Sequence, residues 1–204
     1  MKKTGGMLRQ YLNPGVLESG CDEAGRGCLA GPVFAAAVIL PEGYFNPLLT
    51  DSKLLTPDQR EEFRQEIEAV AVGYSVASVS NTMIDKINIL KASLLAMHRA
   101  ISRLKPVPEF LLIDGHIFRP YKKIPHACII DGDAQYLSIA AASVLAKTRR
   151  DAFMRKLHRK YPHYGWDHNM GYATREHRDA LNLHGITPFH RRSFRLDEQL
   201  RLDL

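Results

Sequence analysis

Cysteines and long hydrophobic runs are both scarce in this sequence. Its three cysteines, Cys21, Cys28 and Cys128, form no C-x-x-C pair. An odd number without paired spacing argues against a disulfide framework and against a structural zinc site, so we expect reduced thiols. No run of about 18 apolar residues, the length that a membrane-spanning helix needs, is present, and the positively charged N-terminus lacks the apolar run of a secretion signal. We therefore expect a soluble, cytoplasmic protein.

Internal repeats, low-complexity segments and an interdomain linker are also lacking. A chain of 204 residues with 45% hydrophobic residues can bury one sizeable core, which favours a single domain. Basic residues outnumber acidic ones by 28 to 22, and the formal net charge is +6. This balance favours a polyanionic partner. Charge alone does not identify a nucleic acid, because many basic proteins bind none.

The spacing of apolar residues predicts an alternation of strands and helices. Short apolar runs bounded by glycine or acidic residues indicate strands, and apolar residues that recur every three or four positions indicate helices. The predicted strands cover residues 16–22, 31–40, about 70–79, 110–114 and 127–131. The predicted helices cover residues 57 to about 69, 90–104, 135–160 and 174 to about 183. This order is typical of an α/β layer fold with a mixed sheet.

Four carboxylates stand at the ends of predicted strands. Asp22 and Glu23 follow the first strand, Asp114 ends a later one, and Asp133 lies just beyond the last. Carboxylates that converge at one sheet edge suit Mg²⁺ or Mn²⁺ better than zinc, and two such ions support in-line attack on a phosphate. For Asp114 or Asp133 alone, ordinary turn chemistry is an open alternative. Turn chemistry explains the adjacent pair Asp22 and Glu23 less well.

The tripeptide Gly25, Arg26 and Gly27 follows the first two carboxylates directly. Its glycines would let a sugar or phosphate approach the backbone, and its guanidinium could fork onto a phosphate. The tripeptide is unspecific by itself. A plain tight turn is an equally good interpretation.

A resemblance to a known family connects these features. Residues 21–33, CDEAGRGCLAGPV, closely resemble the signature of the ribonuclease HII family, and further matches follow in the family's order over nearly the whole chain. They are DSK at 51–53, LLIDG at 111–115, GDA at 132–134, SIAAASVLAKTRRD at 138–151, MGYAT at 170–174 and HRRSF at 190–194.

The resemblance implies a ribonuclease H-like fold, which is a five-stranded mixed sheet flanked by helices with a helical C-terminal portion. Residues 1–204 would form one domain, with a core at about 14–160 and a substrate-binding portion at about 161–204. It further implies an endonuclease that hydrolyses the RNA strand of RNA/DNA hybrids and incises duplex DNA 5′ of embedded ribonucleotides. We expect a monomer. Its metal-binding and catalytic carboxylates would be Asp22, Glu23, Asp114 and Asp133, with Mn²⁺ or Mg²⁺ as the cofactor.

Substrate contacts are implied in the same way. The glycine tripeptide would sense the ribonucleotide 2′-hydroxyl, which distinguishes RNA from DNA locally, and Tyr172 would stack on the following deoxyribose. Lys53, Lys147 and Arg150 resemble phosphate contacts. Core packing of Tyr172, and a solvated role for each basic residue, are the alternatives. The expected substrate-binding residues are Gly25, Arg26, Gly27, Lys53, Lys147, Arg150 and Tyr172.

Two further acidic residues and four histidines lie near these motifs. Asp131 stands where relatives often carry a basic residue, and it could add a ligand or only negative charge; we expect it to point away from Asp133. We interpret Asp151 as a charge partner of its arginine neighbours. The histidines match no zinc pattern, so we expect surface or nucleic-acid-facing roles for them. They are His158, His163, His168 and His177.

Two other functions compete with this interpretation. One is a catalytically silent module that binds RNA/DNA hybrids, against which the intact set of four carboxylates argues. The other is a different enzyme on the same fold, such as a DNA nuclease or a recombinase. Such an enzyme has no use for a 2′-hydroxyl sensor, so the glycine tripeptide and Tyr172 argue against it.

Overall fold

The computed structural model describes residues 7–49, 52 and 55–196. These residues form a five-stranded sheet in the order β3-β2-β1-β4-β5. The pairs β1–β2 and β2–β3 are antiparallel, whereas β1–β4 and β4–β5 are parallel. The predicted mixed sheet is therefore confirmed. Its strands are β1 (Glu18–Ala24), β2 (Val33–Ile39), β3 (Gly73–Val79), β4 (Phe110–Asp114) and β5 (His126–Ile129).

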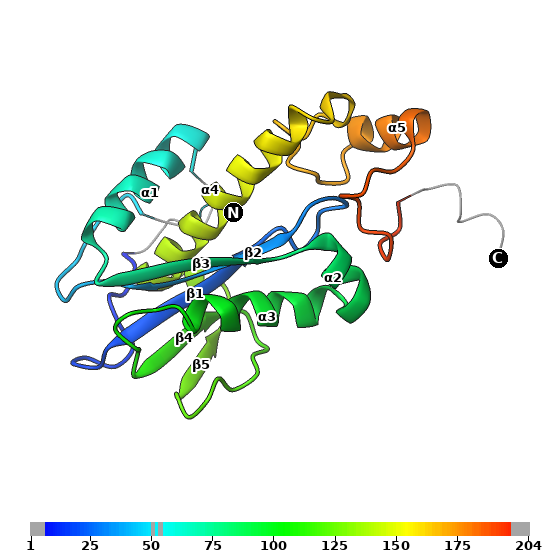
Figure 1. The fold of residues 1–204 in the computed structure, drawn as a ribbon. Helices are drawn as coiled ribbons and strands as arrows, with labels where there is room; N and C mark the ends of the chain where they lie inside the picture. The colour runs from blue at the N-terminus through cyan, green and yellow to red at the C-terminus, as the bar shows by residue number, and fades with distance from the viewer. Residues whose placement is uncertain (1–6, 50–51, 53–54, 197–204) are drawn as a thin grey trace.

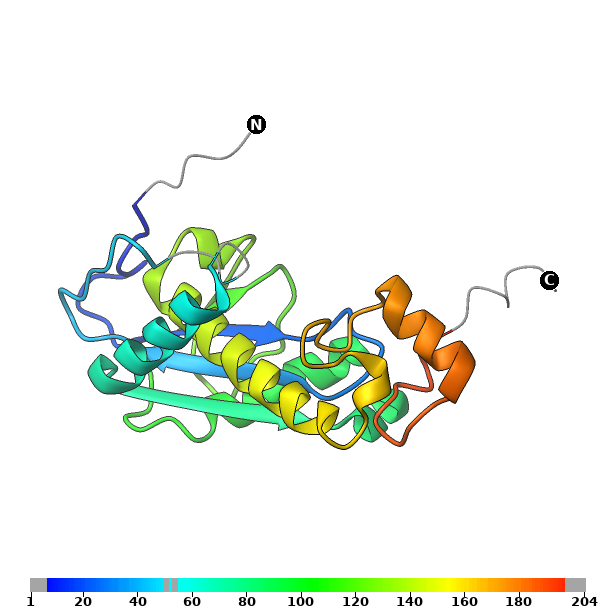
Figure 2. The same ribbon diagram turned by 90° about the horizontal axis from the view of Figure 1, so that it is seen from above.

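Helices cover both faces of the sheet (Figure 1). The helices α1 (Pro57–Val70) and α4 (Leu137–His158) lie on one face, and α2 (Asn81–Ile87) and α3 (Ile89–Ile101) lie on the other. The last helix, α5 (Arg175–His184), lies beyond the C-terminal end of α4 (Figures 1 and 2). None of the helices in the described ranges is both long and apolar enough to cross a bilayer.

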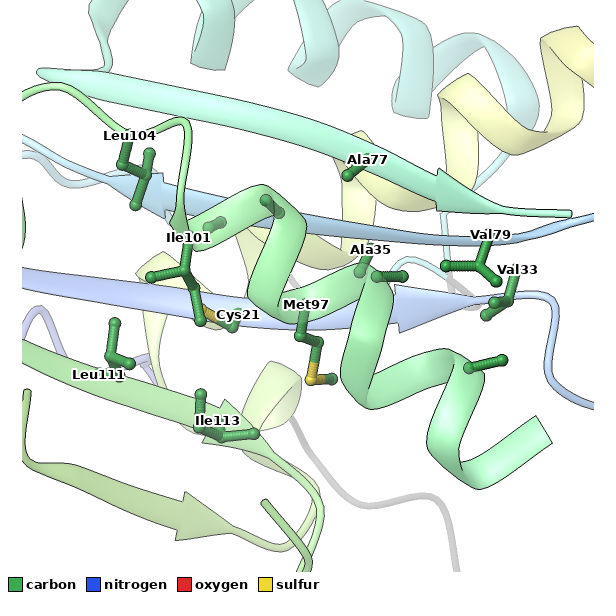
Figure 3. Packing of buried hydrophobic residues seen from close by; sticks show 14 of the residues in the cluster. Cys21, Val33, Ala35, Ala77, Val79, Met97, Ile101, Leu104, Leu111 and Ile113 are labelled. Carbon is green, nitrogen blue, oxygen red and sulfur yellow. The ribbon is translucent and has the colours of Figure 1, made fainter. Parts of the chain in front are cut away.

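Alternating residues of β2 fill the two cores. Ala35 and Ala37 face α3, while Ala36 and Val38 face α4. A strand that is buried on both faces has a continuous apolar sequence, which explains the run VFAAAVI. On the α3 side, Met97 and other apolar side chains of the helix pack onto the strands (Figure 3). The small side chains of β2 allow the helices to lie close to the sheet.

One helix was missed by the sequence analysis. The predicted helix at 90–104 is α3, which ends at Ile101, and α2 precedes it as a separate short helix. The two are divided at Asn88, whose φ of 68° breaks the helical path and whose side chain accepts a hydrogen bond from the Lys91 backbone N–H. Ser80 caps α2 by accepting from Met83 N–H, which is a capping pattern visible in the sequence.

Candidate active site

The sheet brings the four predicted carboxylates to one edge. The strands β1 and β4 are parallel neighbours, and Cys21 pairs with Ile113. Asp22 and Asp114 are the next residues of the two strands, so they lie side by side at the same edge of the sheet. The Asp114 Oδ1 atom accepts a 2.8 Å hydrogen bond from the Gly132 N–H. This bond ties Asp114 to the turn that carries the buried Asp133. Glu23 is adjacent to Asp22 in β1.

The direction of the Asp22 pKa shift indicates that the other three carboxylates lie near Asp22. Burial raises the pKa of Asp22 well above its usual range, and the negative charges of Glu23, Asp114 and Asp133 raise it further, while a hydrogen bond from Ser143 opposes the shift. A cluster of this kind stores repulsion that a cation would relieve. Asp22 is 5% exposed, so water provides little relief.

Asp22 and Glu23, like Asp114, are held in place by donors of the protein. Asp22 Oδ1 accepts from Glu23 N–H at 2.6 Å, and Arg26 Nη1 lies 3.0 Å from Glu23 Oε1. In the described ranges, no three Asp, Glu, His or Cys side chains are placed as a finished coordination shell. The donor set nevertheless fits a hard divalent cation, because it is made of carboxylate oxygens around a buried charge. Each of these contacts engages one oxygen of its carboxylate, so the hydrogen bonds are compatible with coordination of an ion by the same groups.

The glycine tripeptide needs its first glycine for two reasons. Gly25 has a φ of +94°, and a Cβ at this position would lie 1.9 Å from the Arg150 Nε atom. Gly27 is exposed, and a Cβ there would have no atom within 4 Å. The side chain of Arg26, which is 52% exposed, remains open to a ligand. The structure thus places the glycine loop, residues 25–32 between β1 and β2, beside the carboxylates.

Arg150 departs from its predicted role as a phosphate contact. Its side chain is 1% exposed, and its guanidinium donates hydrogen bonds of 2.9 to 3.1 Å to the backbone carbonyls of Ala30, Pro32 and Met170. The helix α4 is buried along most of its length, so Arg150 faces the protein instead of solvent. Its position fits a role as a structural anchor of the loop.

Tyr172 and Lys147 lie together near this loop. Tyr172 is 43% exposed, which does not match core packing. The Lys147 Nζ atom lies 5.9 Å from the centre of the Tyr172 ring and 2.7 Å from Asp151 Oδ1. Asp151 therefore pairs with Lys147, and not with the adjacent arginines as predicted. The predicted contact Lys53 lies outside the described residues.

The remaining sequence candidates are spread over the molecule. Asp131 is exposed in a left-handed turn with a φ of 51°. His158 and His168 approach Asp167 at 3.3 and 2.7 Å, and His163 stacks on the ring of His184. These three histidines do not converge with the carboxylates.

His177 was expected at the surface but is fully buried. Its Nδ1–H donates to the Tyr172 carbonyl at 2.8 Å, and its Nε2 accepts from Trp166 Nε1–H at 3.0 Å and lies 3.1 Å from His190 Nε2. The Thr187 N–H donates to His190 Nδ1, which leaves the His190 proton on Nε2 and both rings neutral. This network fixes the backbone beside Tyr172.

The histidine pair should make the protein less stable in acid. Burial lowers the pKa of His177, and it lowers that of His190 to about 4. Because unfolded histidine binds a proton near pH 6.5, stability is complete above that pH and falls as the pH drops toward about 4. Urea unfolding at pH 7 and pH 5 should show a loss of roughly 1–2 kcal/mol from His190. The loss should shrink in His190→Asn and persist in the exposed-site control His116→Asn; equal losses in all three proteins would contradict this account.

Arg191 and His190 were not among the residues predicted from the sequence to have a functional role. Both lie in the HRRSF segment, which matched the family pattern but received no role. Arg191 is fully buried, and its guanidinium contacts the glycine loop. The sequence did contain a signal for a role of these residues. Basic residues stand together in a segment that matches the family pattern strongly, and solvent exposure alone does not explain such a match.

Comparisons with known proteins identify the family of this chain. The Ribonuclease HII family model matches residues 19–197. Ribonuclease HII of Bacteroides fragilis is 58% identical over 198 residues, which is 96% of this chain and 98% of the relative. Ribonuclease HII of Parabacteroides distasonis is 58% identical over 197 residues, which is 96% of this chain and 99% of the relative.

Solved structures show the same fold. The ribonuclease H2 of Pyrococcus horikoshii OT3 has a TM-score of 0.75 and 25% identity over 90% of this chain and 96% of that one. The PCNA:RNase HII complex from Archaeoglobus fulgidus also gives a TM-score of 0.75, with 26% identity over 90% of this chain and 97% of that one. Bst-RNase HIII in complex with Mn²⁺ shares the fold at a TM-score of 0.64 and 17% identity, over 88% and 67% of the two chains. The chain belongs to the ribonuclease HII family.

Proposed function

We propose that this chain hydrolyses the RNA strand of RNA/DNA hybrids and incises duplex DNA on the 5′ side of an embedded ribonucleotide. The observation that carries the proposal is the approach of carboxylates from β1, from the end of β4 and from the turn at Gly132–Ala134, beside a glycine loop with exposed backbone. The carboxylates supply the chemistry of phosphate hydrolysis. The loop and the exposed Tyr172 ring supply a place to distinguish a ribose from a deoxyribose.

The proposed cofactor is Mg²⁺ or Mn²⁺, held by Asp22, Glu23, Asp114 and Asp133. When bound, such an ion neutralises phosphate charge and makes a bound water more acidic. The neighbour Bst-RNase HIII has been solved in complex with Mn²⁺, which supports an ion of this class. The carboxylates of this chain hold the ion and orient the scissile phosphate, and Asp114 is itself oriented by the Gly132 N–H.

The proposed reaction uses water as the nucleophile. The products would carry 5′-phosphate and 3′-hydroxyl ends, because attack by water displaces the 3′-oxygen of the preceding nucleotide. Attack by the 2′-hydroxyl would instead leave a 2′,3′-cyclic phosphate. Tyr172 and Lys147 are proposed to contact the sugar and the phosphate that follow the ribonucleotide, since the Tyr172 ring is exposed and the half-buried Lys147 Nζ lies 5.9 Å from its centre.

A labelled DNA duplex with one ribonucleotide tests the function directly. We expect incision 5′ of the ribonucleotide with Mg²⁺ or Mn²⁺, none with a chelator, and none in an all-DNA duplex. Asp114→Asn should abolish the incision and the exposed-site control Asp58→Asn should keep it, which excludes a contaminating nuclease. Tight binding without incision would favour a silent binding module. Cutting of the all-DNA duplex would favour a different nuclease, and cyclic phosphate ends would favour a different mechanism.

We also propose that residues 1–204 act as one domain and as a monomer in the cytoplasm. All four carboxylates, the glycine loop and Tyr172 come from a single chain. The C-terminal portion packs on the core through Leu29, Trp166 and Leu181, and Ala30 pairs with His190.

A further inference from the structure

Arg191 is a fully buried arginine whose guanidinium binds backbone carbonyls of the glycine loop. Its Nη2 donates to the Gly25 carbonyl at 2.6 Å and its Nη1 to the Arg26 carbonyl at 2.8 Å, while Nε donates to the Gly31 carbonyl at 3.0 Å. No carboxylate of the described ranges lies within ion-pairing distance of it. A buried guanidinium is costly unless its donors are matched, so these carbonyls must stay directed toward it.

This arrangement fixes the direction of two backbone amides. In a trans peptide the C=O and the following N–H point in opposite directions. Because the carbonyls of Gly25 and Arg26 point inward to Arg191, the N–H groups of Arg26 and Gly27 point outward. Neither N–H has an acceptor within the described part of the chain, and both residues are exposed. A Cβ at Gly27 would have no neighbour within 4 Å, so a ligand can approach.

The segment that carries Arg191 is itself anchored by α2. Asn81 Nδ2 donates to the carbonyls of Pro188 and His190 at 2.8 and 3.2 Å. Asp85 accepts hydrogen bonds from the N–H groups of Arg192 and Ser193 at 3.1 and 2.9 Å. The Arg191 backbone N–H also donates to the Leu29 carbonyl at 2.8 Å. Arg191 is therefore a fixed point against which the loop is oriented.

We propose that Arg191 is a positioning residue that sets the discrimination between ribonucleotide and deoxyribonucleotide. It turns the amides of Arg26 and Gly27 outward as a preformed pair of donors for a hydroxyl oxygen of the ribose. Arg191 is buried behind the loop and does not touch the substrate. This inference rests on the proposed function, because it assigns the loop to the ribonucleotide.

Arg150 provides a matched control within the same loop. It is as buried as Arg191 and also donates to three carbonyls, but these belong to Ala30, Pro32 and Met170. Arg150 thus stabilises the loop without orienting the peptides before Arg26 and Gly27. Replacing either arginine with lysine keeps the charge and removes the planar fork. A purely structural role predicts the same effect on binding from both replacements.

The test measures binding in an Asp114→Asn background, where cleavage does not interfere. We expect the parent to bind a duplex with one ribonucleotide more tightly than an all-DNA duplex. Arg191→Lys should reduce this ratio by about tenfold, which corresponds to the loss of one or two hydrogen bonds. Affinity for the all-DNA duplex should change little. Arg150→Lys should retain the ratio, with circular dichroism and thermal unfolding recorded for both variants.

A ratio unchanged in folded Arg191→Lys, or reduced equally in Arg150→Lys, would overturn the proposal. If Arg191→Lys does not fold, amide NMR on the Asp114→Asn protein decides. The Arg26 and Gly27 resonances should shift with the ribonucleotide duplex and not with the all-DNA duplex, and the same response to both would refute the inference. Failure of the proposed function is distinguishable, because the parent itself would then show no preference for the ribonucleotide duplex.

Discussion

Asp22→Asn is expected to abolish hydrolysis and, at the same time, to stabilise the metal-free protein. Asp22 lies at the centre of the carboxylate group, since the charges of Glu23, Asp114 and Asp133 all act on it. In the proposed role of Asp22 as a metal ligand, its loss removes several kcal/mol of transition-state stabilisation, so the cleavage rate should fall by about a thousandfold or more. The shape of the site should be kept, because the asparagine Oδ1 can still accept from Glu23 N–H.

The stabilisation follows from the direction of the pKa shift. Burial and like charge raise the pKa of Asp22 in the folded protein. Between the unfolded and the folded pKa the native state holds the proton more tightly, so stability falls as the pH rises through this window. At neutral pH the aspartate therefore costs stability that asparagine does not. Adding Mg²⁺ should reverse the order, because a bound cation offsets the repulsion in the parent and not in the variant.

Thermal unfolding with a chelator and with Mg²⁺, at pH 4 and pH 8, checks both parts. The difference between parent and Asp22→Asn should be small at pH 4, which is near the pKa of an unfolded aspartate, and larger at pH 8, where the unfolded chain is fully ionised. Asp58→Asn, an exposed site in the first turn of α1, is the matched control; it should leave activity unchanged and alter stability by less than about 1 kcal/mol, at both pH values in the same direction. A metal-free variant less stable than its parent at pH 8 would contradict the argument.

The sequence offered the four carboxylates as candidates because they stand at the ends of predicted strands, but it could not place those strands relative to one another. The adjacency of β1 and β4 is a long-range pairing that local periodicity does not encode. Arg150 and His177 were misplaced for a related reason. Both occur among polar residues, and only the tertiary contacts of α4 and α5 with the glycine loop and with Trp166 bury them.

The helix α2, which was not predicted, also shows that local sequence patterns do not reveal long-range contacts. Its seven residues are too few for a strong periodic signal, and its role depends on Asn81 and Asp85, whose partners lie more than 100 residues away. The sequence indicates which chemical groups are available for the candidate site. The direction of individual side chains and amides is decided by packing between distant segments.

Among glycine-to-alanine substitutions, Gly20→Ala is expected to lower the stability of the fold the most. Gly20 lies in β1, two residues before Asp22, and a Cβ there would lie 2.1 Å from the Ser138 carbonyl carbon and 2.4 Å from the Ile139 nitrogen. These are backbone atoms at the start of α4, so no side chain can move aside. The helix would have to shift from the sheet, which should cost about 3 kcal/mol or more.

A small domain has a total stability of roughly 5–15 kcal/mol, so Gly20→Ala should lower the unfolding midpoint in urea severely or prevent folding. Gly27→Ala is the matched control, because its Cβ would meet nothing within 4 Å and its φ is not positive; its stability should stay within about 0.5 kcal/mol of the parent. Equal unfolding midpoints for the two variants would show that α4 can move without cost. Gly20 therefore allows α4 to pack closely on β1, whereas the candidate catalytic residues of this strand begin at Asp22.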